Sequence, residues 1–586
     1  MLQDRGKIMD LSFGGSGDVQ KRNSYRRGLF GALALALGLV AITPSCSVIV
    51  DTSTKQCAVN TDCPNGMKCE EGVCVGGGDV ICANTSECSA AGAEQFCRKA
   101  PGAASGVCKP LKSPECQVIE GDPTAENAFL IGSIHPTTAT GFDGEIGVSM
   151  ENSIRLAIRD MKGNVGGLPS VGGGSPRPVV MIGCTDAGEA TVSVKAARHL
   201  IDNLGVQAII GGAFSGVALE TANQATLDAR VLLISASATG IALTGVDDTP
   251  PGATAGLLWR TVPSDIFQAN AILQYVPQLE KRIREELGLT DEPIKLALVH
   301  KGDAYGRGLR SALEATLTFN GKTALNNGEN FLLVDYGDPD GTTKYPETIE
   351  AVKNHGSHIV LMFGTGEAVS SLYGPIEIGW NSALGYKPRY VFSDSNYNTG
   401  ALAGAIDVGA DAAAKADWRK RTTGVVPGPQ NTDQNYQLFV NLYGTTFGTE
   451  NGDPSILGAA SAYDAAYLLF YSASTIADGV ITGQKLAEGM TKMSNADPAM
   501  VGEINSGPGK LSDTMKKLMS GEYKSIDYNG AFGPLDFDPE TNDPAANVQV
   551  FCLSDDGTGK TKEQLSGQYY EAESQMLKGT FTDACK

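Results

Sequence analysis

Residues 128–161 read AFLIGSIHPTTATGFDGEIGVSMENSIRLAIRDM, and this stretch decides the fold class. Its opening run AFLIGSI (128–134) is short and almost wholly apolar, which predicts a buried strand. Apolar residues then recur with the i, i+3, i+4, i+7 spacing of one helix face, at Ile154, Ala157, Ile158 and Met161. This helix is expected to stop at Gly163. A buried strand that leads into an amphipathic helix is the repeating unit of α/β folds.

The same alternation of short apolar runs and helical segments continues along the chain. Further short apolar runs are VVMIG (179–183), VQAIIGG (206–212), VLLIS (231–235), KLALVH (295–300), HIVLMF (358–363) and RYVFS (389–393). Helical segments lie between them, among them 190–204 and 266–287. Strands that alternate with helices predict parallel sheets covered by helices on both faces. Because ligands of such folds bind at the carboxyl ends of the strands, the loops after each strand are the candidate site.

Six segments, in this order, resemble the type I periplasmic binding proteins of the Leu/Ile/Val-binding branch, which serve amino-acid ABC transporters. They are residues 131–161, 203–243, 258–272 (LWRTVPSDIFQANAI), 296–313 (LALVHKGDAYGRGLRSAL), 439–469 and 528–543 (YNGAFGPLDFDPETND). The resemblance implies two α/β lobes that close on a ligand by hinge motion. It assigns about 126–260 and 422–527 to lobe one, and about 261–421 and 528–586 to lobe two.

The resemblance also implies which lobe-one residues meet a ligand. In the amino-acid binders, hydroxyl and backbone groups after the third and fourth strands hold the ligand carboxylate. Ser215, in GGAFSG, and Ser237 and Thr239, in SASAT, fall on these positions. Small hydroxyl residues let backbone N–H groups converge on an anion at the start of a helix. The alternative is that they cap the helices that follow.

Lobe two is expected to contribute an aromatic side chain and an acid. Tyr305, in DAYGRG, matches a ligand-contacting tyrosine of the family, and Asp394, in VFSDSN, falls where the family has a carboxylate for the ligand's ammonium. An aspartate in such a loop is also typical of turns and caps. Thr365 replaces a further family tyrosine, so side-chain specificity does not carry over. Phe142 is a candidate wall of the pocket.

The 13 cysteines are unevenly placed, and ten of them lie between Cys46 and Cys116. Two quartets stand out, Cys57, Cys63, Cys69, Cys74 and then Cys82, Cys88, Cys97, Cys108. They predict a small disulfide-rich module over 57–116, because so short a segment cannot bury its own core. Each quartet allows three pairings. Zinc is the alternative, although the C-x2-C spacing of zinc ribbons is absent. The module is interpreted as a stiff spacer or a docking unit.

Three further cysteines fall in the main domain. The family often has a disulfide cysteine after the second strand, as Cys184 does here, but its usual partner position is Phe214. Cys116 is therefore the expected partner of Cys184, which would staple the module to lobe one. Cys552 and Cys585 are then expected to close the tail.

The N-terminal region predicts export. Basic residues precede an uncharged run of 15 residues, Gly28–Ile42, which is too short to span a bilayer. This pattern is typical of a signal peptide, assigned to 1–45. Cys46 directly follows and resembles the lipidation site of bacterial lipoproteins, with a tether over 46–56. The alternative is an uncleaved anchor.

The charge and the missing motifs exclude other classes of function. A net charge of −20 disfavours nucleic acid as a partner. Neither a G-x-S-x-G elbow nor an H-E-x-x-H helix occurs, so no catalysis, metal or cofactor is expected. The sequence predicts an exported, membrane-anchored binding protein that captures a small amino acid or similar zwitterion for an ABC permease. The alternative is a surface sensor of the same fold that works without a transporter.

Overall fold

A computed structural model gives the conformation of most of the chain. It describes residues 57, 59, 67–70, 73–77, 80–91, 94–125, 127–170, 174–339, 341–409, 411–428, 433–448, 450–476, 479–494, 501–582 and 585. The expected signal peptide (1–45), the lipidation site Cys46, the tether (46–56) and Cys63 lie outside these residues, as does the side chain of Cys74.

Lobe one is built on a six-stranded sheet with the order β11-β10-β9-β7-β8-β6. Its strands are β6 (Cys116–Glu120), β7 (Phe129–His135), β8 (Val179–Thr185), β9 (Ala208–Gly211), β10 (Leu232–Ser235) and β11 (Leu258–Arg260). All pair in parallel except β6, which runs antiparallel to β8. Every residue of β7 is buried, and α1 (Phe142–Asn164) follows it, as the opening stretch predicts.

Helices cover both faces of this sheet. On one face lie α1 and four helices from later in the chain, α11 (Gln434–Phe447), α12 (Ala459–Ser474), α13 (Gly483–Met490) and α14 (Pro508–Ser520). On the other lie α2 (Ala190–Arg198), η3 (His199–Leu204), α3 (Ser215–Thr221), η4 (Ala222–Thr226) and α4 (Leu227–Ala229). Burial on both faces explains why the strands read as continuous apolar runs rather than alternating ones.

Lobe two has an eight-stranded sheet with the order β15-β12-β16-β17-β18-β23-β24-β25. The first five neighbours are parallel, namely β12 (Leu296–His300), β15 (Phe331–Asp335), β16 (Ile359–Phe363), β17 (Arg389–Phe392) and β18 (Thr422–Pro427). The last three extend it antiparallel, namely β23 (Val548–Asp555), β24 (Thr561–Glu571) and β25 (Met576–Gly579).

Helices also cover both faces of the second sheet. Against one face pack α5 (Asp265–Leu287) and α6 (Ala304–Glu314), with the hairpin β13 (Thr318–Phe319) and β14 (Lys322–Thr323). The other face carries α7 (Tyr345–His355), η8 (Ala368–Tyr373), α8 (Gly374–Ile378), α9 (Ala401–Asp407) and α10 (Ala412–Lys420). The predicted α/β class with parallel sheets is therefore confirmed in both lobes.

The chain crosses between the lobes at places that differ from the expected boundaries. Strand β18, expected to open the second part of lobe one at 422, pairs with β17 and belongs to the sheet of lobe two. Conversely, Tyr528 and Phe537, expected in lobe two, are buried in the core of lobe one. Their short strands β20 (Asp527–Asn529), β21 (Asp536–Phe537) and β22 (Pro544–Ala545) precede the true crossing into β23. Backbone pairing and core packing, rather than sequence order, decide these memberships.

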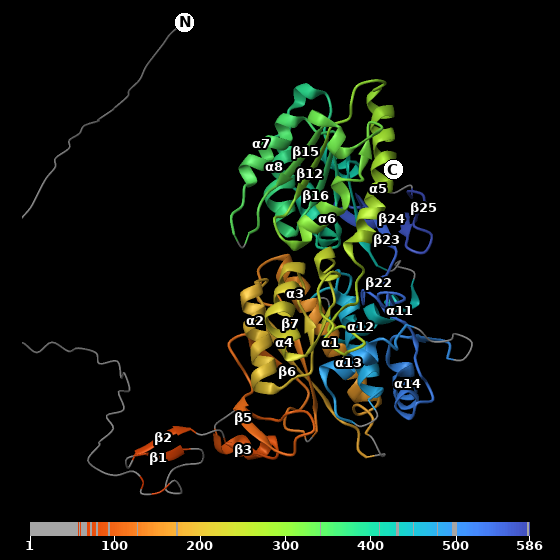
Figure 1. The fold of residues 1–586 in the computed structure, drawn as a ribbon. Coiled ribbons are helices and arrows are strands. Elements are labelled where there is room, and N and C mark those ends of the chain that lie inside the picture. Colours follow the sequence, from red (N-terminus) through yellow and green to blue (C-terminus); the bar gives the residue numbers. More distant parts are fainter. Residues whose placement is uncertain are drawn as a thin grey trace, which may run out of the picture.

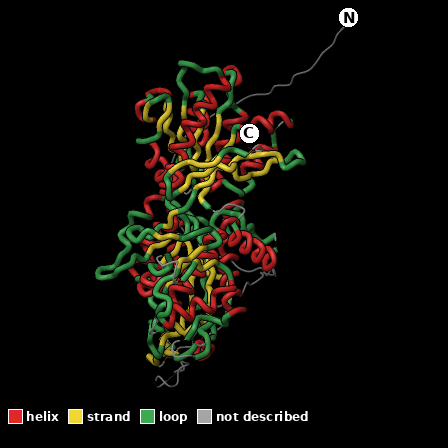
Figure 2. Tube along the Cα trace, turned by 90° about the vertical axis from the view of Figure 1, so that its right-hand side faces the viewer, coloured by secondary structure: helices red, strands yellow, loops and turns green. Residues whose placement is uncertain are grey.

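The two lobes lie one above the other, with the cysteine-rich module at the far end of lobe one (Figure 1). The view turned by 90° shows the same two bodies, each with its own strands (Figure 2). Among the residues that the structure describes, no helix combines the length and apolar character needed to cross a bilayer.

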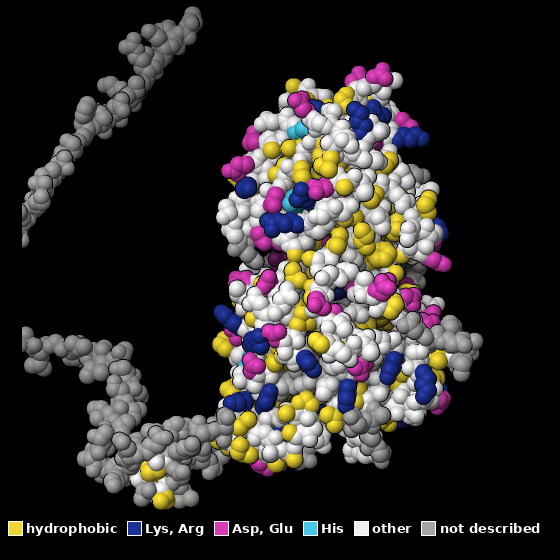
Figure 3. All heavy atoms as spheres, in the orientation of Figure 1, with side chains coloured by type: hydrophobic (Ala, Val, Ile, Leu, Met, Phe, Trp, Pro, Cys, Tyr) yellow, Lys and Arg dark blue, Asp and Glu magenta, His cyan; other side chains and the backbone are white. Residues whose placement is uncertain are grey.

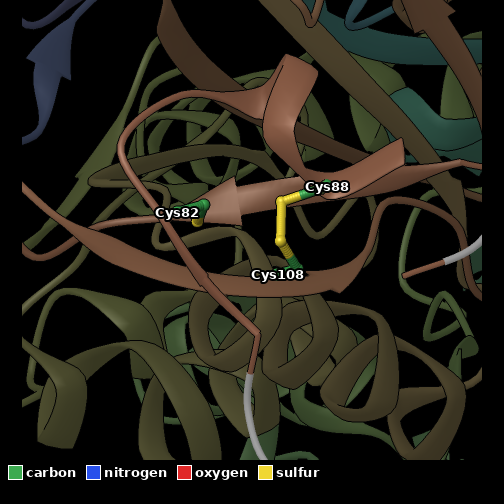
Figure 4. Close-up of side chains that lie close together, drawn as sticks. All are labelled: Cys82, Cys88 and Cys108. Atoms are coloured by element: carbon green, nitrogen blue, oxygen red, sulfur yellow. A yellow bond between two sulfur atoms is a disulfide. The ribbon is translucent and has the colours of Figure 1, made fainter. Parts of the chain in front are cut away.

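The disulfides select one pairing for the second quartet. Cys82 pairs with Cys97 and Cys88 with Cys108, and these bonds crosslink β3 (Ile81–Cys82), η2 (Thr85–Ala91), β4 (Gln95–Arg98) and β5 (Gly106–Pro110). Figure 4 shows Cys82, Cys88 and Cys108 close together, with the Cys88–Cys108 bond drawn. These three sulfurs are the one group of potential metal ligands in the described part of the chain. Because they are engaged in disulfides, they are not the thiolates that zinc binds.

Other cysteines connect this module to its surroundings. Cys57 pairs with Cys69 of β1 (Met67–Glu70), which forms a hairpin with β2 (Val73–Gly77). The two expected staples, Cys116–Cys184 and Cys552–Cys585, are both present. The module over 80–111 is not a free spacer, because Phe96 and Leu111 are buried in the core of lobe one. The main-chain oxygen of Leu111 also lies 3.1 Å from Nε2 of His199.

Candidate functional site

The candidate ligand residues all follow the carboxyl ends of parallel strands. In lobe one, Ser215 begins α3 after β9, and Ser237 and Thr239 follow β10. In lobe two, Tyr305 lies in α6 after β12, and Asp394 follows β17. The sequence thus places both halves of the site at the sheet edges where α/β folds bind ligands.

The lobe-one hydroxyls organise the loops in which they stand. The Ser215 Oγ accepts a hydrogen bond of 3.0 Å from Gly240 N, and the Ser237 hydroxyl donates one of 2.7 Å to Ala213 O. These bonds tie the loop after β9 to the loop after β10. Ser215 is not the N-cap of α3, since Phe214 holds that position. The capping alternative is therefore wrong for Ser215, whose hydroxyl fixes the neighbouring loop instead.

Lobe two brings Tyr305 and Asp394 together, as the resemblance implies. The Tyr305 hydroxyl donates to Oδ1 of Asp394, and both side chains are buried. Asp394 N donates to Oε1 of Gln268 at 3.2 Å. The Gln268 amide in turn donates to Oδ1 of Asp265 at 2.7 Å, so Gln268 links the backbone of Asp394 to the carboxyl group of Asp265.

Asp265 was not foreseen as a site residue, although its segment was recognised as the crossing into lobe two. It is the first residue of α5, is fully buried and donates its backbone N–H to Thr239 O at 2.8 Å. Its Oδ2 atom has no hydrogen-bond partner among the described residues. An acid in the first turn of a helix is an ordinary feature, so the segment alone gave no signal for a role in the site.

Burial sets the electrostatics of this carboxyl pair. Desolvation, and next the nearby charge of Asp394, raise the pKa of Asp265 well above its usual value. Desolvation also raises the pKa of Asp394, against the hydrogen bond from Tyr305, which lowers it. Two buried carboxylates cannot both ionise cheaply without a positive charge beside them. The pair is therefore suited to a cation with several N–H donors.

Thr365 and its surroundings replace the family's further tyrosine. The Thr365 hydroxyl and the Tyr336 hydroxyl both donate to the carboxylate of Glu367, the latter at 2.6 Å. Tyr336 comes from the end of β15, and its hydroxyl lies 1.8 Å from where a Cβ on Gly364 would stand. A tyrosine hydroxyl is thus present on the same carboxylate as Thr365, but it comes from the end of β15, which is separated from β16 by β12 in the sheet.

Phe142 lies between the lobes. It opens α1 of lobe one, yet its ring would meet a Cβ built on Gly366 at 3.6 Å and one on Gly400 at 4.0 Å, both in lobe two. Its position fits the expected wall across the cleft.

A small apolar cavity borders the same region. Its volume is about 50 Å³, and residues of both lobes line it, among them Tyr397, Tyr436, Ile456 and Phe532. Gly458 also lines it, and a Cβ built on Gly458 would stand 3.0 Å from Cβ of Ser237. The cavity therefore adjoins the candidate hydroxyls on one side.

Comparisons with known proteins agree with this architecture. A family model described as periplasmic binding protein matches residues 131–558, well over half of the chain. The Leu/Ile/Val-binding protein BraC3 of Rhizobium johnstonii is 29% identical over 205 residues, which cover 35% of this chain and 48% of that protein. The Leu/Ile/Val-binding protein homolog 3 of Brucella melitensis is 27% identical over 240 residues, 40% of this chain and 54% of that protein. The chain thus spans about half the length of these relatives.

Solved structures share the fold at lower identity. The leucine-binding protein LivK of Thermotoga maritima superposes with a TM-score of 0.50 at 17% identity, covering 75% of this chain and 98% of that one. A solute-binding protein of R. palustris in complex with 4-hydroxybenzoate gives a TM-score of 0.51 at 16% identity, covering 78% and 98%.

Proposed function

Because the chain belongs to the family of periplasmic binding proteins, we propose that it captures a small amino acid or similar zwitterion between its two lobes for an ABC-type permease. The family is one of solute-binding proteins rather than enzymes. The captured molecule is released unchanged when the lobes open.

The buried pair Asp265 and Asp394 is the observation that carries this proposal. Proteins of similar fold include a leucine-binding protein and one bound to 4-hydroxybenzoate, so a zwitterion and an aromatic acid are the two candidates compared. A ligand whose only charge is negative would bring no positive charge to this carboxyl pair. An ammonium would instead find the unpartnered Oδ2 of Asp265 and the carboxylate of Asp394.

The other groups of the ligand are inferred from the loops of lobe one and from the cavity beside them. The loops after β9 and β10 offer the hydroxyls of Ser215, Ser237 and Thr239 and nearby backbone N–H groups, which suit a carboxylate. Beyond Ser237, the cavity lined by Tyr397, Ile456 and Phe532 is apolar and small. It favours a short apolar side chain.

Export and anchoring complete the proposal. The uncharged run Gly28–Ile42 and the cysteine that follows it, Cys46, support a signal peptide and a lipid anchor. The disulfides of the described region support an oxidising compartment outside the cytoplasm. The protein would then work at the membrane surface, near a permease.

A thermal-shift screen tests the binding proposal. A ligand that binds only the folded state stabilises it by about 2.7 kcal/mol at a concentration of 100 times Kd. The twenty amino acids and 4-hydroxybenzoate are compared for the rise in Tm that each gives. We expect one or a few small apolar amino acids to raise Tm and 4-hydroxybenzoate to leave it unchanged. The reverse result would contradict the role of the carboxyl pair.

Asp394→Asn tests the contact with the ammonium. The control is Asp303→Asn, in the same lobe, because Asp303 is an N-cap whose Oδ1 accepts from Gly306 N at 2.9 Å. The active amino acid should shift the control and fail to shift Asp394→Asn. If both variants respond as the wild type does, the ammonium does not lie at Asp394.

A further inference from the structure

A second and larger cleft lies at the other end of lobe one. It opens where the cysteine-rich module meets the lobe and has a volume of about 1050 Å³. Phe129 and Leu130, which line it, are the first residues of β7, whereas the candidate site follows the carboxyl ends of the strands. The cleft is therefore separate from the site between the lobes. Its size matches that of pockets that hold drug-sized or larger molecules, about 300–1,000 Å³.

The walls of this cleft are fixed on both sides. On the module side, the Cys82–Cys97 bond lies directly beside the lining residue Phe96, which is itself buried in the core of lobe one. On the lobe side, Arg177 bridges two segments, because its guanidinium donates to Asn127 O at 2.6 Å and to Gly479 O at 3.2 Å. The cleft exists only because the module docks, and neither part forms it alone.

The described residues of the cleft carry a charge opposite to that of the protein. The lining residues that the structure describes include two cations, Lys99 and Arg177, and neither an aspartate nor a glutamate. Arg98 adds a third cation at its margin, since its Nε is buried without a partner and lies 3.5 Å from where a Cβ on the lining residue Gly205 would stand. In a chain of net charge −20, three cations with no acid among the described lining residues form an anion-attracting region.

About half of the lining surface is apolar. It includes Phe96, Phe129, Leu130, Leu168, Ile481 and Met519. The guanidinium of Arg177 lies 6.0 Å from the centroid of the Phe129 ring, so charge and apolar surface meet at one point. Burial also lowers the pKa of Arg177, as expected for a guanidinium desolvated beside apolar groups. Lys and Arg side chains (dark blue) recur on the lower lobe above the module in Figure 3.

We propose that this cleft binds an anionic amphiphile, a carboxylate or phosphate attached to a hydrocarbon chain, independently of the site between the lobes. The cations hold the anionic head, and the apolar side chains cover the hydrocarbon. The same chemistry is presented by a free acyl anion and by the head of an anionic lipid in the membrane.

Calorimetric titration of the purified protein with three ten-carbon probes tests the head-group requirement. Decanoate and decyl phosphate should bind, whereas decanol, which lacks the charge, should bind at least about fivefold more weakly. Asp394→Asn should bind decanoate as the wild type does. Equal binding of decanol, or loss of decanoate binding in Asp394→Asn, would overturn the proposal, since the probe would then be held by apolar contact alone or lie between the lobes.

Two variants locate the probe. Lys99→Glu should weaken decanoate binding at least about fivefold, and its control is Lys195→Glu, the same charge change on an exposed position of lobe one outside the cleft. Ala103→Trp places a large side chain on the lining without removing a side-chain contact and should also weaken binding. If both variants bind as the control does, the cleft is not the site.

Vesicles distinguish the source of the anion. Co-sedimentation is measured with phosphatidylglycerol vesicles and with phosphatidylcholine vesicles, for the wild type, Lys99→Glu and Lys195→Glu. Binding to phosphatidylglycerol that Lys99→Glu weakens assigns the cleft to a lipid head group, whereas binding of soluble probes alone assigns it to a free acyl anion. Binding to neither overturns the proposal.

Discussion

The buried guanidinium of Arg260 pairs with the carboxylate of Asp543, which lies 283 positions further along the chain. Its Nε donates to Oδ1 of Asp543 at 2.7 Å. The same guanidinium donates to Gly240 O at 3.0 Å and to Oγ1 of Thr244 at 2.6 Å. One side chain thus joins the end of β11, the loop that carries Thr239 and the loop between β21 and β22. The ion pair holds the lobe-one half of the candidate site in place.

Breaking this pair should cost stability. Arg260→Met leaves the Asp543 carboxylate buried without its partner, and removing one member of a buried pair costs about 3–5 kcal/mol. The measurement is urea-induced unfolding followed by circular dichroism. The control is Arg310→Met, which removes a partly exposed pair with Glu314 of the i, i+4 type and should cost about 0.5 kcal/mol or less. Equal losses in the two variants would contradict a special role for Arg260.

The sequence reached the fold because its signals are local. The run 128–134 and the helix face after it depend on side chains a few positions apart, and the structure has β7 and α1 there. The staple Cys116–Cys184 was also expected, because the family resemblance marks Cys184 as a disulfide cysteine and Phe214 holds its usual partner position. The points where the chain crosses between the lobes were not predicted, because Tyr528 enters the core of lobe one by packing against residues far away in the chain.

The sequence predicted residues of the candidate site only at positions that match the family's motifs. Tyr305 and Asp394 do meet, although 89 positions separate them. Gln268 and Asp265 join them by hydrogen bonds that connect α5 to the loop after β17, 126 positions away. Nothing in the segment LWRTVPSDIFQANAI marks its aspartate as a partner of another carboxyl group. The docking of the module was missed for a similar reason, because Phe96 and Leu111 find their core contacts in lobe one.

The carboxyl pair predicts a pH dependence of stability. The pKa of Asp265 is raised on folding, so the folded state holds its proton where the unfolded chain has lost it. This contribution is fully present below the unfolded pKa of about 3.9. It is lost as the pH rises through the raised folded value. Asp265→Asn has no such proton to lose. Without ligand, the variant should therefore have a larger free energy of unfolding than the wild type at about pH 8, and this difference should be smaller at about pH 5.

The same pair predicts how ligand binding responds to pH. A cation favours the ionised carboxyl groups, so binding should release protons and weaken as the pH falls. Tyr305, Gln268, Thr239 and Arg260 face the pair, and burial raises the pKa of Tyr305 well above its usual value. Calorimetry of the active amino acid in two buffers of different ionisation enthalpy measures the protons released. An affinity that is constant from about pH 5 to pH 8, without proton release, would contradict the assignment.

The two long-range disulfides should stabilise the segments that they join as well as the whole fold. Cys116–Cys184 closes a loop of 68 residues and Cys552–Cys585 one of 33 residues, so by chain entropy each stabilises by about 4 kcal/mol. Their loss is measured as urea unfolding of the double serine variants, and hydrogen exchange locates the effect. Removal of the first should speed exchange in β6 and in the docked module, and removal of the second in β24 and β25. The same exchange pattern in both variants would show that neither staple acts where it lies.

Gly364 should not tolerate a side chain. A Cβ there would stand 1.8 Å from the hydroxyl of Tyr336, which is fully buried, so packing must shift to make room. Gly364→Ala should therefore lower the free energy of unfolding by about 1–3 kcal/mol, as overpacking of a close contact does. It should also weaken ligand binding, because the Tyr336 hydroxyl would be pushed from Glu367 beside Thr365. Two residues on, Gly366→Ala is the matched control, because its nearest contact would be the Phe142 ring at 3.6 Å, an ordinary van der Waals distance. The control should change stability by less than about 0.5 kcal/mol, and equal unfolding curves for the two alanine variants would contradict the close packing of Tyr336 against this loop.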